Sequence, residues 1–260
     1  MGRARMRARM AAGETLFGLG VRLSRSAEIA AVAEAAGFDW LFVDMEHNAI
    51  SIERAAEIAL VAGALGLPAL VRVPGADALA AARLLDGGAT GIVVPHVETA
   101  EEIRPIVAAC RFPPAGRRSI GGPLPQLGYA PLPVAEHMRR AEEETMIVAM
   151  IESPEAVENA HDIARVEGVD ALLVGSNDLA LSLGVPGELA HPAIERAYRR
   201  ILEAAREAGK PAGLGGVYTA ELLARYLPLG FRFVLLGNDL SLLLASARDR
   251  LEKARAIVAA

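Results

Sequence analysis

The sequence predicts a (β/α)₈ barrel, also called a TIM barrel, and three observations support this fold class. Short runs of apolar, β-branched and aromatic residues alternate eight times with segments that have helical spacing of apolar residues. Several of these runs end abruptly in charged residues, which is how parallel strands deliver an active site to one end of a barrel. No Gly-rich dinucleotide-binding motif follows the first run, so the main alternative, a doubly wound open sheet, is less favoured.

Eight strands are expected, in order along the chain. Each run is apolar almost throughout, because the strands of a barrel are covered on both faces. The expected strands are Leu16–Val21, Trp40–Asp44, Ala69–Val73, Gly91–Pro95, Met146–Glu152, Ala171–Gly175, Ala212–Gly216 and Phe231–Gly237.

A helix is expected after each strand, and a last helix closes the chain. Ser26, Ser51 and Ser153 each precede an acidic first turn, as N-cap residues do. Glycine follows most of the helical patterns, as a C-terminal cap does; these glycines are Gly37, Gly66, Gly88, Gly168, Gly209 and Gly230. The expected helices are Ser26–Ala36, Ile52–Leu65, Ala78–Asp86, Ala100–Ala109, Val134–Glu144, Pro154–Arg165, Pro192–Ala208, Ala220–Tyr226 and Ser241–Ala259.

The organisation of the chain predicts one folded domain that follows a tail. At 260 residues, length alone allows one barrel or two small domains, but no linker or low-complexity break divides the chain. The first ten residues carry four arginines and lack the apolar core of a secretory signal. We therefore expect a flexible basic tail over residues 1–13 and a single barrel domain over residues 14–260.

Charge and cysteine content exclude several classes of partner and site. The net charge of −5 leaves no basic footprint for nucleic acid. No apolar run reaches the ~20 residues that a membrane-spanning helix needs. Cys110 is the only cysteine, so neither an internal disulfide nor a multi-cysteine metal site can form. We expect a cytoplasmic protein that acts on small molecules and binds neither nucleic acid nor membranes.

One long irregular stretch, Arg111–Pro133, interrupts the regular alternation. A loop of this length in a compact domain is commonly functional. Since it comes after the fourth strand, we expect it on the side of the barrel where the chemistry occurs. Arg118, with Gly121 and Gly122, would there provide a cation on a flexible loop that binds an anionic substrate.

Glu152 and Asp178 are the candidate metal ligands. They follow the fifth and sixth strands, whose ends are neighbours in a barrel. Two carboxylates with open remaining positions suit a hard divalent cation that keeps waters and takes substrate oxygens. The alternative is that both acids cap helices, which their positions before Ser153 and within Gly175–Leu179 also allow.

Arg72 and His47 are the candidate catalytic residues. Arg72 ends the third strand and would present a fixed cationic fork to a carboxylate or an enolate oxygen. An ion pair between Arg72 and Asp44 or Glu46 is the alternative, and both interpretations can hold. His47 comes three residues after Asp44, and a histidine held by an acid is a common general base; the alternative is a loop histidine without a role.

Two further rim positions could take part in binding. His96 follows the fourth strand and occupies a position similar to that of His47. The turn formed by Gly175, Ser176 and Asn177 leads into a helix, whose first backbone N–H groups could bind a carboxylate. An ordinary turn without a ligand is the alternative for so short a motif.

Taken together, these motifs resemble the HpcH/HpaI aldolase family, which includes 4-hydroxy-2-oxoheptanedioate and 2-keto-3-deoxy-sugar-acid aldolases and is related to citrate lyase β subunits. The resemblance covers nearly all of residues 14–258. Asp44-Met45-Glu46-His47 is similar to the D-x-E-H element of the family, and Phe112–Arg118 is similar to its aromatic-Pro-Pro-x-G-x-R segment. The other matching segments are Arg72-Val73-Pro74, Val94-Pro95, Ile151-Glu152, Val166–Asp170 and Gly175–Leu179.

The resemblance implies a metal-dependent, class II aldolase that makes or breaks a carbon–carbon bond between a pyruvate enolate and an aldehyde. Glu152 and Asp178 would hold Mg²⁺ or Mn²⁺, with Co²⁺ as a further candidate. Arg72 would stabilise the enolate, and His47 supported by Asp44 would belong to the acid–base apparatus.

The resemblance also implies how the chains assemble. Dimers would assemble further into a hexamer, with the C-terminal helix exchanged between protomers. Asp86 is similar to an acid that the family presents across a subunit interface. The apolar positions of Ser241–Ala259 exceed what one face of a barrel needs, which agrees with such an exchange.

Three departures from the family pattern leave the substrate open. Met150 stands where oxoheptanedioate aldolases have glutamine, and Arg118–Gly122 replaces the R-G-x-G of their loop. Ser176-Asn177-Asp178 replaces the common Pro-Ala-Asp. An oxaloacetate-type decarboxylase or a CoA-ester lyase on the same metal–enolate site is therefore an alternative, and a non-catalytic metabolite-binding barrel is a third.

Overall fold

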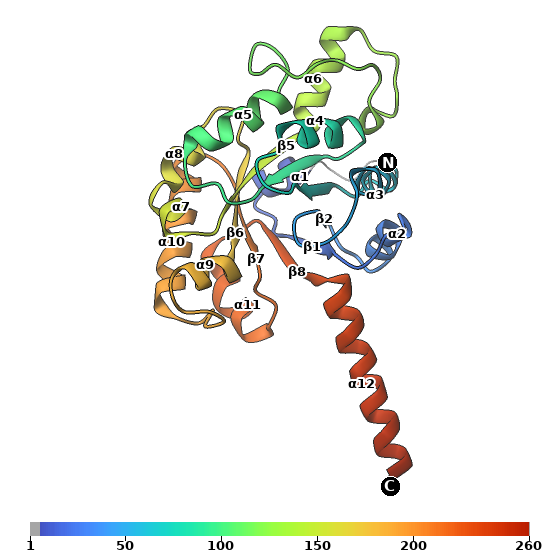
Figure 1. Cartoon of the computed structure of the whole chain (residues 1–260), viewed down its shortest axis with the longest axis vertical. Coiled ribbons are helices and arrows are strands. Elements are labelled where there is room, and N and C mark those ends of the chain that lie inside the picture. The colour runs from blue at the N-terminus through green and yellow to red at the C-terminus, as the bar shows by residue number, and fades with distance from the viewer. Residues whose placement is uncertain (1–5, 260) are drawn as a thin grey trace.

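The structure is a computed structural model that describes residues 6–259. Within this range, eight parallel strands form a closed barrel in which each strand pairs with the next and β8 pairs with β1 (Figure 1). The strands are β1 (Leu16–Val21), β2 (Trp40–Asp44), β3 (Ala69–Arg72), β4 (Gly91–Val94), β5 (Met146–Ile151), β6 (Ala171–Gly175), β7 (Ala212–Gly215) and β8 (Phe233–Asn238). The predicted barrel fold is confirmed.

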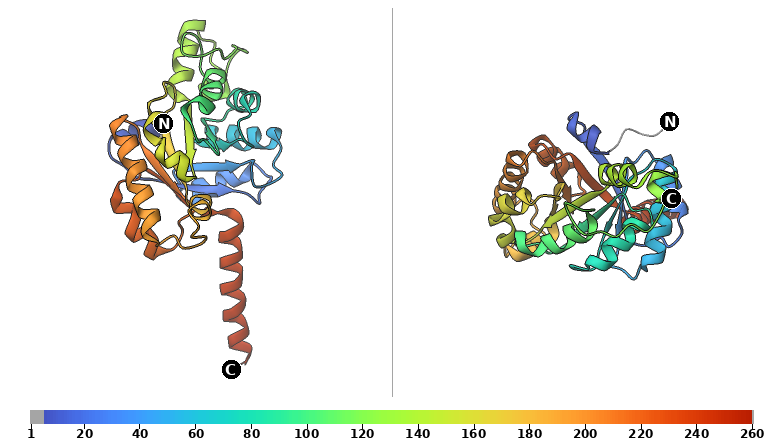
Figure 2. Two further views of the ribbon diagram at one scale, coloured as in Figure 1. Left: turned by 60° about the vertical axis from the view of Figure 1, so that its left-hand side comes forward. Right: turned by 90° about the horizontal axis from the view of Figure 1, so that it is seen from above.

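Helices surround the barrel on its outside, except α1 and α12, whose positions are described below (Figure 2). They are α1 (Met6–Ala11), α2 (Glu28–Ala35), α3 (Ile52–Ala64), α4 (Ala78–Asp86), α5 (Ala100–Cys110), α6 (Val134–Glu144), α7 (Pro154–Glu158), α8 (Ala160–Arg165), α9 (Ser176–Ser182), α10 (Pro192–Glu207), α11 (Ala220–Tyr226) and α12 (Asp239–Ala259). Two short 3₁₀ helices, η1 (Pro125–Leu127) and η2 (Leu227–Leu229), lie in loops. The helix expected over residues 154–165 is divided at Asn159 into α7 and α8.

Two of the three expected serine caps are present; the N-cap of α2 is Ala27 instead of Ser26, and its side chain makes no capping hydrogen bond. The Ser51 hydroxyl accepts from the backbone N–H of Arg54, and the Ser153 hydroxyl accepts from that of Ala156. All six predicted capping glycines have positive φ angles, which side chains rarely tolerate. These local signals explain why the boundaries of the elements could be predicted closely.

The core has two layers, which the alternation of side chains along the strands separates. Side chains that point into the barrel form one cluster, in which the rings of Trp40 and Phe233 meet edge to face with centroids 5.8 Å apart. Side chains on the other face of each strand pack against the helices in a larger cluster. Gly18 is required by this packing, because a Cβ there would lie 2.3 Å from the Trp40 ring.

Residues 6–13 do not form the expected flexible tail. Met6 and Met10 of α1 are buried and belong to the cluster of side chains inside the barrel. Arg9 forms an ion pair with Asp39, which directly precedes β2. The tail expectation is therefore wrong for this part of the chain, because α1 carries apolar side chains that cover the amino ends of the strands; residues 1–5 lie outside the described residues.

The loop over residues 111–133 also lies elsewhere than expected. It follows α5, which runs antiparallel to the strands, so the chain has already returned to their amino ends. Pro125 and Tyr129 line a hollow together with Pro68, Thr90 and Met146, which stand at or just before the starts of β3, β4 and β5. The expectation that this loop borders the chemistry of its own barrel is wrong.

The last helix, α12, projects away from the barrel (Figures 1 and 2). Residues 240–259 are exposed throughout, including seven large apolar side chains. These side chains are Leu240, Leu242, Leu243, Leu244, Leu251, Ile257 and Val258. Among the described residues, no helix combines the length and apolar character that crossing a membrane requires.

Candidate active site

The inward-facing positions of the strands deliver charged groups to the carboxyl end of the barrel. In β2, Trp40 and Phe42 point inward, and the next position of the same parity is Asp44. In β3 the corresponding sequence is Leu70 then Arg72, and Arg72 stands beside Asp44 in the strand register. Because side chains alternate strictly along a strand, the apolar filling of the barrel fixes where these charges point.

Arg72 and Asp44 form a bidentate pair that is almost fully buried. Arg72 Nε donates to Asp44 Oδ1 at 3.0 Å, and Nη2 donates to Oδ2 at 2.8 Å. Burial opposes ionisation of Asp44, but the hydrogen bonds and charge of Arg72 outweigh it and hold the pKa of this carboxyl below its usual value. The predicted ion pair is present, and it fixes the plane of the guanidinium.

Glu46 and His96 join the two halves of the site, a connection that sequence reasoning missed. Arg72 Nη1 lies 2.8 Å from Glu46 Oε2, and His96 Nε2 lies 2.7 Å from Glu46 Oε1. The other side of His96 reaches Glu152, whose Oε1 accepts from the His96 backbone N–H at 2.7 Å. His96 has a φ of 53°, an unusual conformation for a non-glycine residue, and it lies two residues after the end of the buried strand β4.

Glu152 presents one oxygen without a partner. Its side chain is 3% exposed, and Oε2 is a buried atom with no hydrogen-bond partner in the structure. Burial raises the pKa of Glu152, the His96 backbone N–H lowers it, and the nearby charge of Asp178 raises it again, with a net upward shift. A cation between Glu152 and Asp178 would satisfy the orphaned oxygen and remove the repulsion, so these residues fit a divalent metal ion.

The end of β6 leaves room for this carboxylate. A Cβ at Gly175 would lie 2.4 Å from Glu152 Oε2, so only glycine allows the carboxylate its observed position. Among residues 6–259, no group of three or more His, Cys, Asp or Glu side chains is arranged to hold a metal. A two-carboxylate set matches hard ions such as Mg²⁺, which keep several waters.

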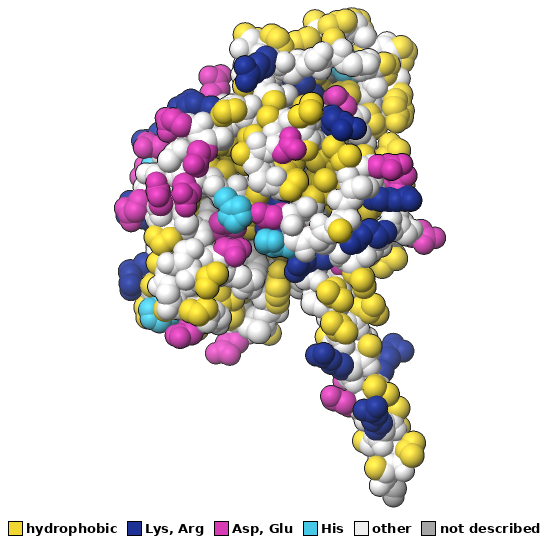
Figure 3. Space-filling view, in the orientation of Figure 1, with side chains coloured by type: hydrophobic (Ala, Val, Ile, Leu, Met, Phe, Trp, Pro, Cys, Tyr) yellow, Lys and Arg dark blue, Asp and Glu magenta, His cyan; other side chains and the backbone are white. Residues whose placement is uncertain are grey.

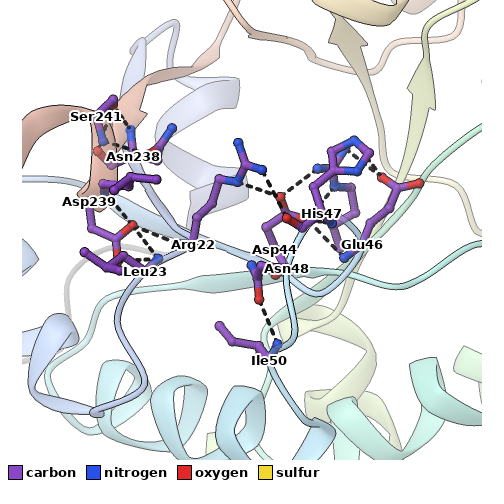
Figure 4. Close-up of polar contacts among 12 residues, drawn as sticks. Arg22, Leu23, Asp44, Glu46, His47, Asn48, Ile50, Asn238, Asp239 and Ser241 are labelled. Carbon is purple, nitrogen blue, oxygen red and sulfur yellow. Dashed lines mark hydrogen bonds and ion pairs between the residues drawn. The ribbon is translucent and has the colours of Figure 1, made fainter. Parts of the chain in front are cut away.

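The contacts of His47 differ from those expected. Asp44 Oδ1 accepts from the His47 backbone N–H at 3.2 Å, while the His47 ring lies 3.7 Å from Glu46 Oε2 (Figure 4). The expectation that the Asp44 carboxylate holds the imidazole is therefore wrong, because that carboxylate is occupied by Arg72. The His47 side chain is 45% exposed and lines the cavity described next.

A cavity of about 110 Å³ brings most of the predicted residues together. Its lining includes the predicted catalytic, metal and turn residues Asp44, His47, Arg72, Gly175, Ser176, Asn177 and Asp178. The Ser176 hydroxyl accepts a hydrogen bond from the Tyr198 hydroxyl at 2.6 Å, and Ser176 is buried. Figure 3 shows histidine and acidic side chains gathered near the middle of the same face.

Arg118 does not reach this cavity. Its guanidinium donates to Asp86 at 2.7 Å and lies over the Phe112 ring at 4.9 Å from the centroid. Asp86 ends α4, at the amino end of the barrel. The expectation that Arg118 binds the substrate of its own barrel is wrong, because the loop that carries it follows α5 instead of a strand.

Sequence reasoning also missed several residues of the cavity wall. Arg22 follows β1, Tyr218 follows β7 and Asn238 ends β8, and all three line the cavity. The pattern that identified the other candidates, a charged residue directly after an apolar run, also holds for Arg22 and could have identified it. Met150 lies on the same wall, with its sulfur 3.8 Å from Arg72 Nη1.

Comparison with known proteins gives concordant results. A profile described as HpcH/HpaI aldolase/citrate lyase matches residues 21–246. The chain is 37% identical over 243 residues to a 4-hydroxy-4-methyl-2-oxoglutarate aldolase of Chaetomium globosum, which covers 92% of this chain and 90% of that protein. It is 35% identical over 244 residues to a 4-hydroxy-2-oxo-heptane-1,7-dioate aldolase of Shigella sonnei, with 93% and 91% covered.

A solved structure supports the same relationship. The crystal structure of an HpcH/HpaI aldolase from Desulfitobacterium hafniense superposes with a TM-score of 0.91 at 30% identity and covers 97% of both chains. The similarity therefore extends over nearly the whole chain.

Proposed function

The chain belongs to the HpcH/HpaI aldolase/citrate lyase family, and from this premise we propose that it is a class II aldolase acting on a 2-oxo acid. It would make or break the bond between C3 of a pyruvate enolate and a carbonyl carbon. The printed names of both relatives contain a 2-oxo and a 4-hydroxy group, the pattern that such a reaction forms or cleaves.

One observation carries the proposal. A guanidinium locked by two carboxylates lines the cavity, and the orphaned oxygen of Glu152 lies against Gly175, which is part of the cavity wall. The fixed guanidinium of Arg72 can stabilise a substrate oxygen that becomes negative during the reaction. The acids Glu152 and Asp178 can bind a divalent ion. Preorganised charge directed at a developing oxyanion commonly supplies the largest part of catalysis.

The residues would divide the work as follows. Glu152 and Asp178 hold the divalent ion, Mg²⁺ or Mn²⁺ in the first instance and Co²⁺ as a third choice, which supplies Lewis acidity when bound. Arg72 stabilises the keto oxygen as it gains the electrons of the breaking C3–C4 bond. Asp44 and Glu46 orient Arg72 and hold it in place, so its fork does not have to reorganise during the reaction.

His47 would handle the proton of the 4-hydroxyl group. Its ring is half exposed at the mouth of the cavity, so a water molecule can lie between the ring and the substrate oxygen. Asp44 acts on His47 only through the backbone N–H, which positions the loop. In the cleavage direction His47 accepts the proton through water, and in the condensation direction it returns it.

Two related reactions use the same groups. Decarboxylation of an oxaloacetate-type acid also produces an enolate, so the same cavity could support it. A CoA-ester lyase is less supported, because the chain carries a net charge of −5, whereas the phosphates of CoA favour a basic surface. A non-catalytic barrel would not need the buried, unsatisfied Glu152 oxygen.

Exchange of the methyl protons of pyruvate for deuterium tests the proposal without knowledge of the acceptor. We expect exchange that depends on Mg²⁺ or Mn²⁺ and is abolished by EDTA. Borohydride with pyruvate should leave the protein unmodified, because the only lysines are Lys210, before β7 at the amino end of the barrel, and Lys253 in α12. Absence of metal-dependent exchange, or a trapped pyruvyl-lysine, would refute the class II assignment.

Assembly and location complete the proposal. The exposed apolar side chains of α12 support packing of this helix on a neighbouring protomer, in a homo-oligomer that we take to be a hexamer. The partners would otherwise be small molecules, a 2-oxo acid and an aldehyde, and the location would be the cytoplasm.

A further inference from the structure

Arg22 is a second cation at the mouth of the barrel. It follows β1 at the next inward-facing position after Gly20, and it lines the cavity together with Arg72 and Asp178. A Cβ at Gly20 would lie 3.0 Å from Asn238 Cβ, so glycine at this position allows β1 and the end of β8 to approach closely beside Arg22. The cavity therefore lies between two guanidinium groups with different surroundings.

The charge of Arg22, unlike that of Arg72, is weakly compensated. Its Nη2 donates to the His47 carbonyl oxygen at 3.1 Å, and its Nε lies 3.5 Å from Asp44 Oδ2. Asp44 already accepts both hydrogen bonds of the Arg72 fork, and Arg22 Nε is a buried atom without a hydrogen-bond partner. The Arg22 side chain is 41% exposed, so its remaining N–H groups are accessible from the cavity.

The backbone at Arg22 is fixed in place. The Asp239 carboxylate accepts hydrogen bonds from three consecutive N–H groups, those of Arg22 at 2.8 Å, Leu23 at 2.9 Å and Ser24 at 2.7 Å (Figure 4). A cation held on an anchored backbone loses little freedom when it binds an anion, which favours recognition.

Neutral polar groups line the same wall. Burial raises the pKa of Tyr218, which keeps its hydroxyl protonated and able to donate. The Asn238 side chain also lines the cavity. A planar cation flanked by a hydroxyl and an amide is a common way to bind a carboxylate.

We propose that Arg22 binds a carboxylate carried by the carbonyl acceptor, so that the aldol processed by this protein is a dicarboxylate. The inference rests on the proposed function, because it assigns the second half of the same substrate. Arg72 serves the 2-oxo acid end, and Arg22 serves the far end.

Equilibrium binding of two matched ligands to the full-length protein with Mg²⁺ tests this assignment. 2-Oxoglutarate and 2-oxovalerate share their carbon chain and differ only in a terminal carboxylate or methyl group. We expect calorimetry to show that 2-oxoglutarate binds about 10- to 100-fold more tightly, the range for one charge-assisted hydrogen-bonded pair. Arg22→Gln should abolish this preference, and Arg22→Lys should keep part of it.

A control variant separates the cation from the loop. Arg25 donates to the carbonyl oxygens of residues 22–24 but does not line the cavity. Arg25→Gln makes the same change of charge in the same loop, and it should leave the preference for 2-oxoglutarate intact. Loss of the preference in this variant would attribute the effect to loop conformation and would count against the proposal.

Three results would overturn it: equal affinities in the unmodified protein, a preference that persists in Arg22→Gln, or equal losses for both ligands in that variant. The last result would make Arg22 a positioning residue for the His47 loop. Failure of the aldolase assignment is a separate observation, the absence of pyruvate proton exchange in the unmodified protein, and the binding ratio can be read in either case.

Discussion

At the residue scale, Asp44 determines the geometry of the site. Its two oxygens accept the fork of Arg72, and Oδ1 also accepts the backbone N–H groups of Glu46 and His47. One buried carboxylate thus orients the cation and shapes the loop that carries the expected proton-transfer residue. The consequence is that the guanidinium of Arg72 is held in a fixed plane.

Replacing Arg72 by lysine tests that fixed plane. Arg72→Lys keeps the charge but loses the planar fork, so we expect kcat to fall by about 10²-fold, as on removal of one oxyanion donor. Binding of Mg²⁺, measured by calorimetry, should survive because Glu152 and Asp178 are unchanged. The matched exchange Arg54→Lys on the exposed face of α3 should have no effect, and near-normal turnover of Arg72→Lys would reduce Arg72 to a structural role.

Replacing Asp44 by asparagine tests the energetic contribution of the pair. The variant leaves a buried guanidinium with a neutral partner, so we expect a loss of about 3 kcal/mol in the free energy of unfolding near pH 7. The folded pKa of Asp44 is lowered, so its contribution is present above the unfolded value near 3.9 and is lost as pH falls through the folded value. Urea unfolding of both proteins from pH 7 downward should show the difference shrinking only below about pH 4; a difference independent of pH would contradict this.

The residues of the site could be predicted from sequence where strand alternation decides, and not where contacts decide. Arg72, Glu152 and Asp178 follow from strand ends, and all three lie at the cavity or its rim. The bridging role of His96 depends on a positive φ, which no local pattern indicates. The Arg72–Asp44 ion pair was among the predicted contacts, whereas the predicted contact between the Asp44 carboxylate and the His47 ring is wrong, because the strand register places Arg72 beside Asp44.

At the element scale, the end of β6 leaves room for the carboxylate of Glu152, the proposed metal ligand. Gly175→Ala would put a methyl group into the position of Glu152 Oε2. We expect Mg²⁺ affinity to fall about 10- to 100-fold, as for other changes that displace a metal ligand indirectly. Calorimetric titration with Mg²⁺ checks this directly, and unaltered affinity would show that Glu152 does not bind the ion in this position.

A second glycine gives the control for that change. Gly63 lies inside α3, and a Cβ there would meet no heavy atom within 4 Å. Gly63→Ala should leave Mg²⁺ affinity unchanged and should stabilise the protein slightly, by up to about 1 kcal/mol, through helix propensity.

The elements themselves were predicted closely, and the exceptions have a common cause. Strand and helix boundaries follow from apolar patterning, caps and glycines, which are local signals. The placement of α1 and of residues 111–133 depends on which end of the barrel the chain has reached. The loop was predicted at the carboxyl end of the barrel because it comes after β4. This was wrong, because α5 lies between β4 and the loop and carries the chain back to the amino ends of the strands.

At the scale of the whole molecule, α12 is the helix whose residues 240–259 do not pack against their own barrel. Truncation at residue 240 removes the exposed apolar side chains from Ser241 onward and keeps Asp239, which anchors the Arg22 loop. If α12 packs on a neighbouring protomer, we expect sedimentation to show loss of the oligomer, together with loss of solubility as the covered groove becomes exposed. A truncated chain that is soluble, monomeric and active in pyruvate exchange would refute the exchanged helix.

Single substitutions give a milder version of the same test. Leu243 in α12 and Leu79 in α4 are both leucines with more than half of their surface exposed. Leu243→Glu should weaken assembly, whereas Leu79→Glu should not, because only the first would bury a charge in the proposed contact. Equal behaviour of the two variants would show that α12 is not a contact surface.

The position of Asp239 connects these scales. The same residue begins α12 and holds the three backbone N–H groups from which the Arg22 side chain extends. One carboxylate therefore ties the start of α12 to the loop that carries the cation at the mouth of the barrel. If docking of α12 on a neighbouring protomer stabilises the Arg22 loop, assembly and acceptor binding are coupled, and each strengthens the other by the same factor. The affinity for the acceptor would then rise with the concentration of the protein itself.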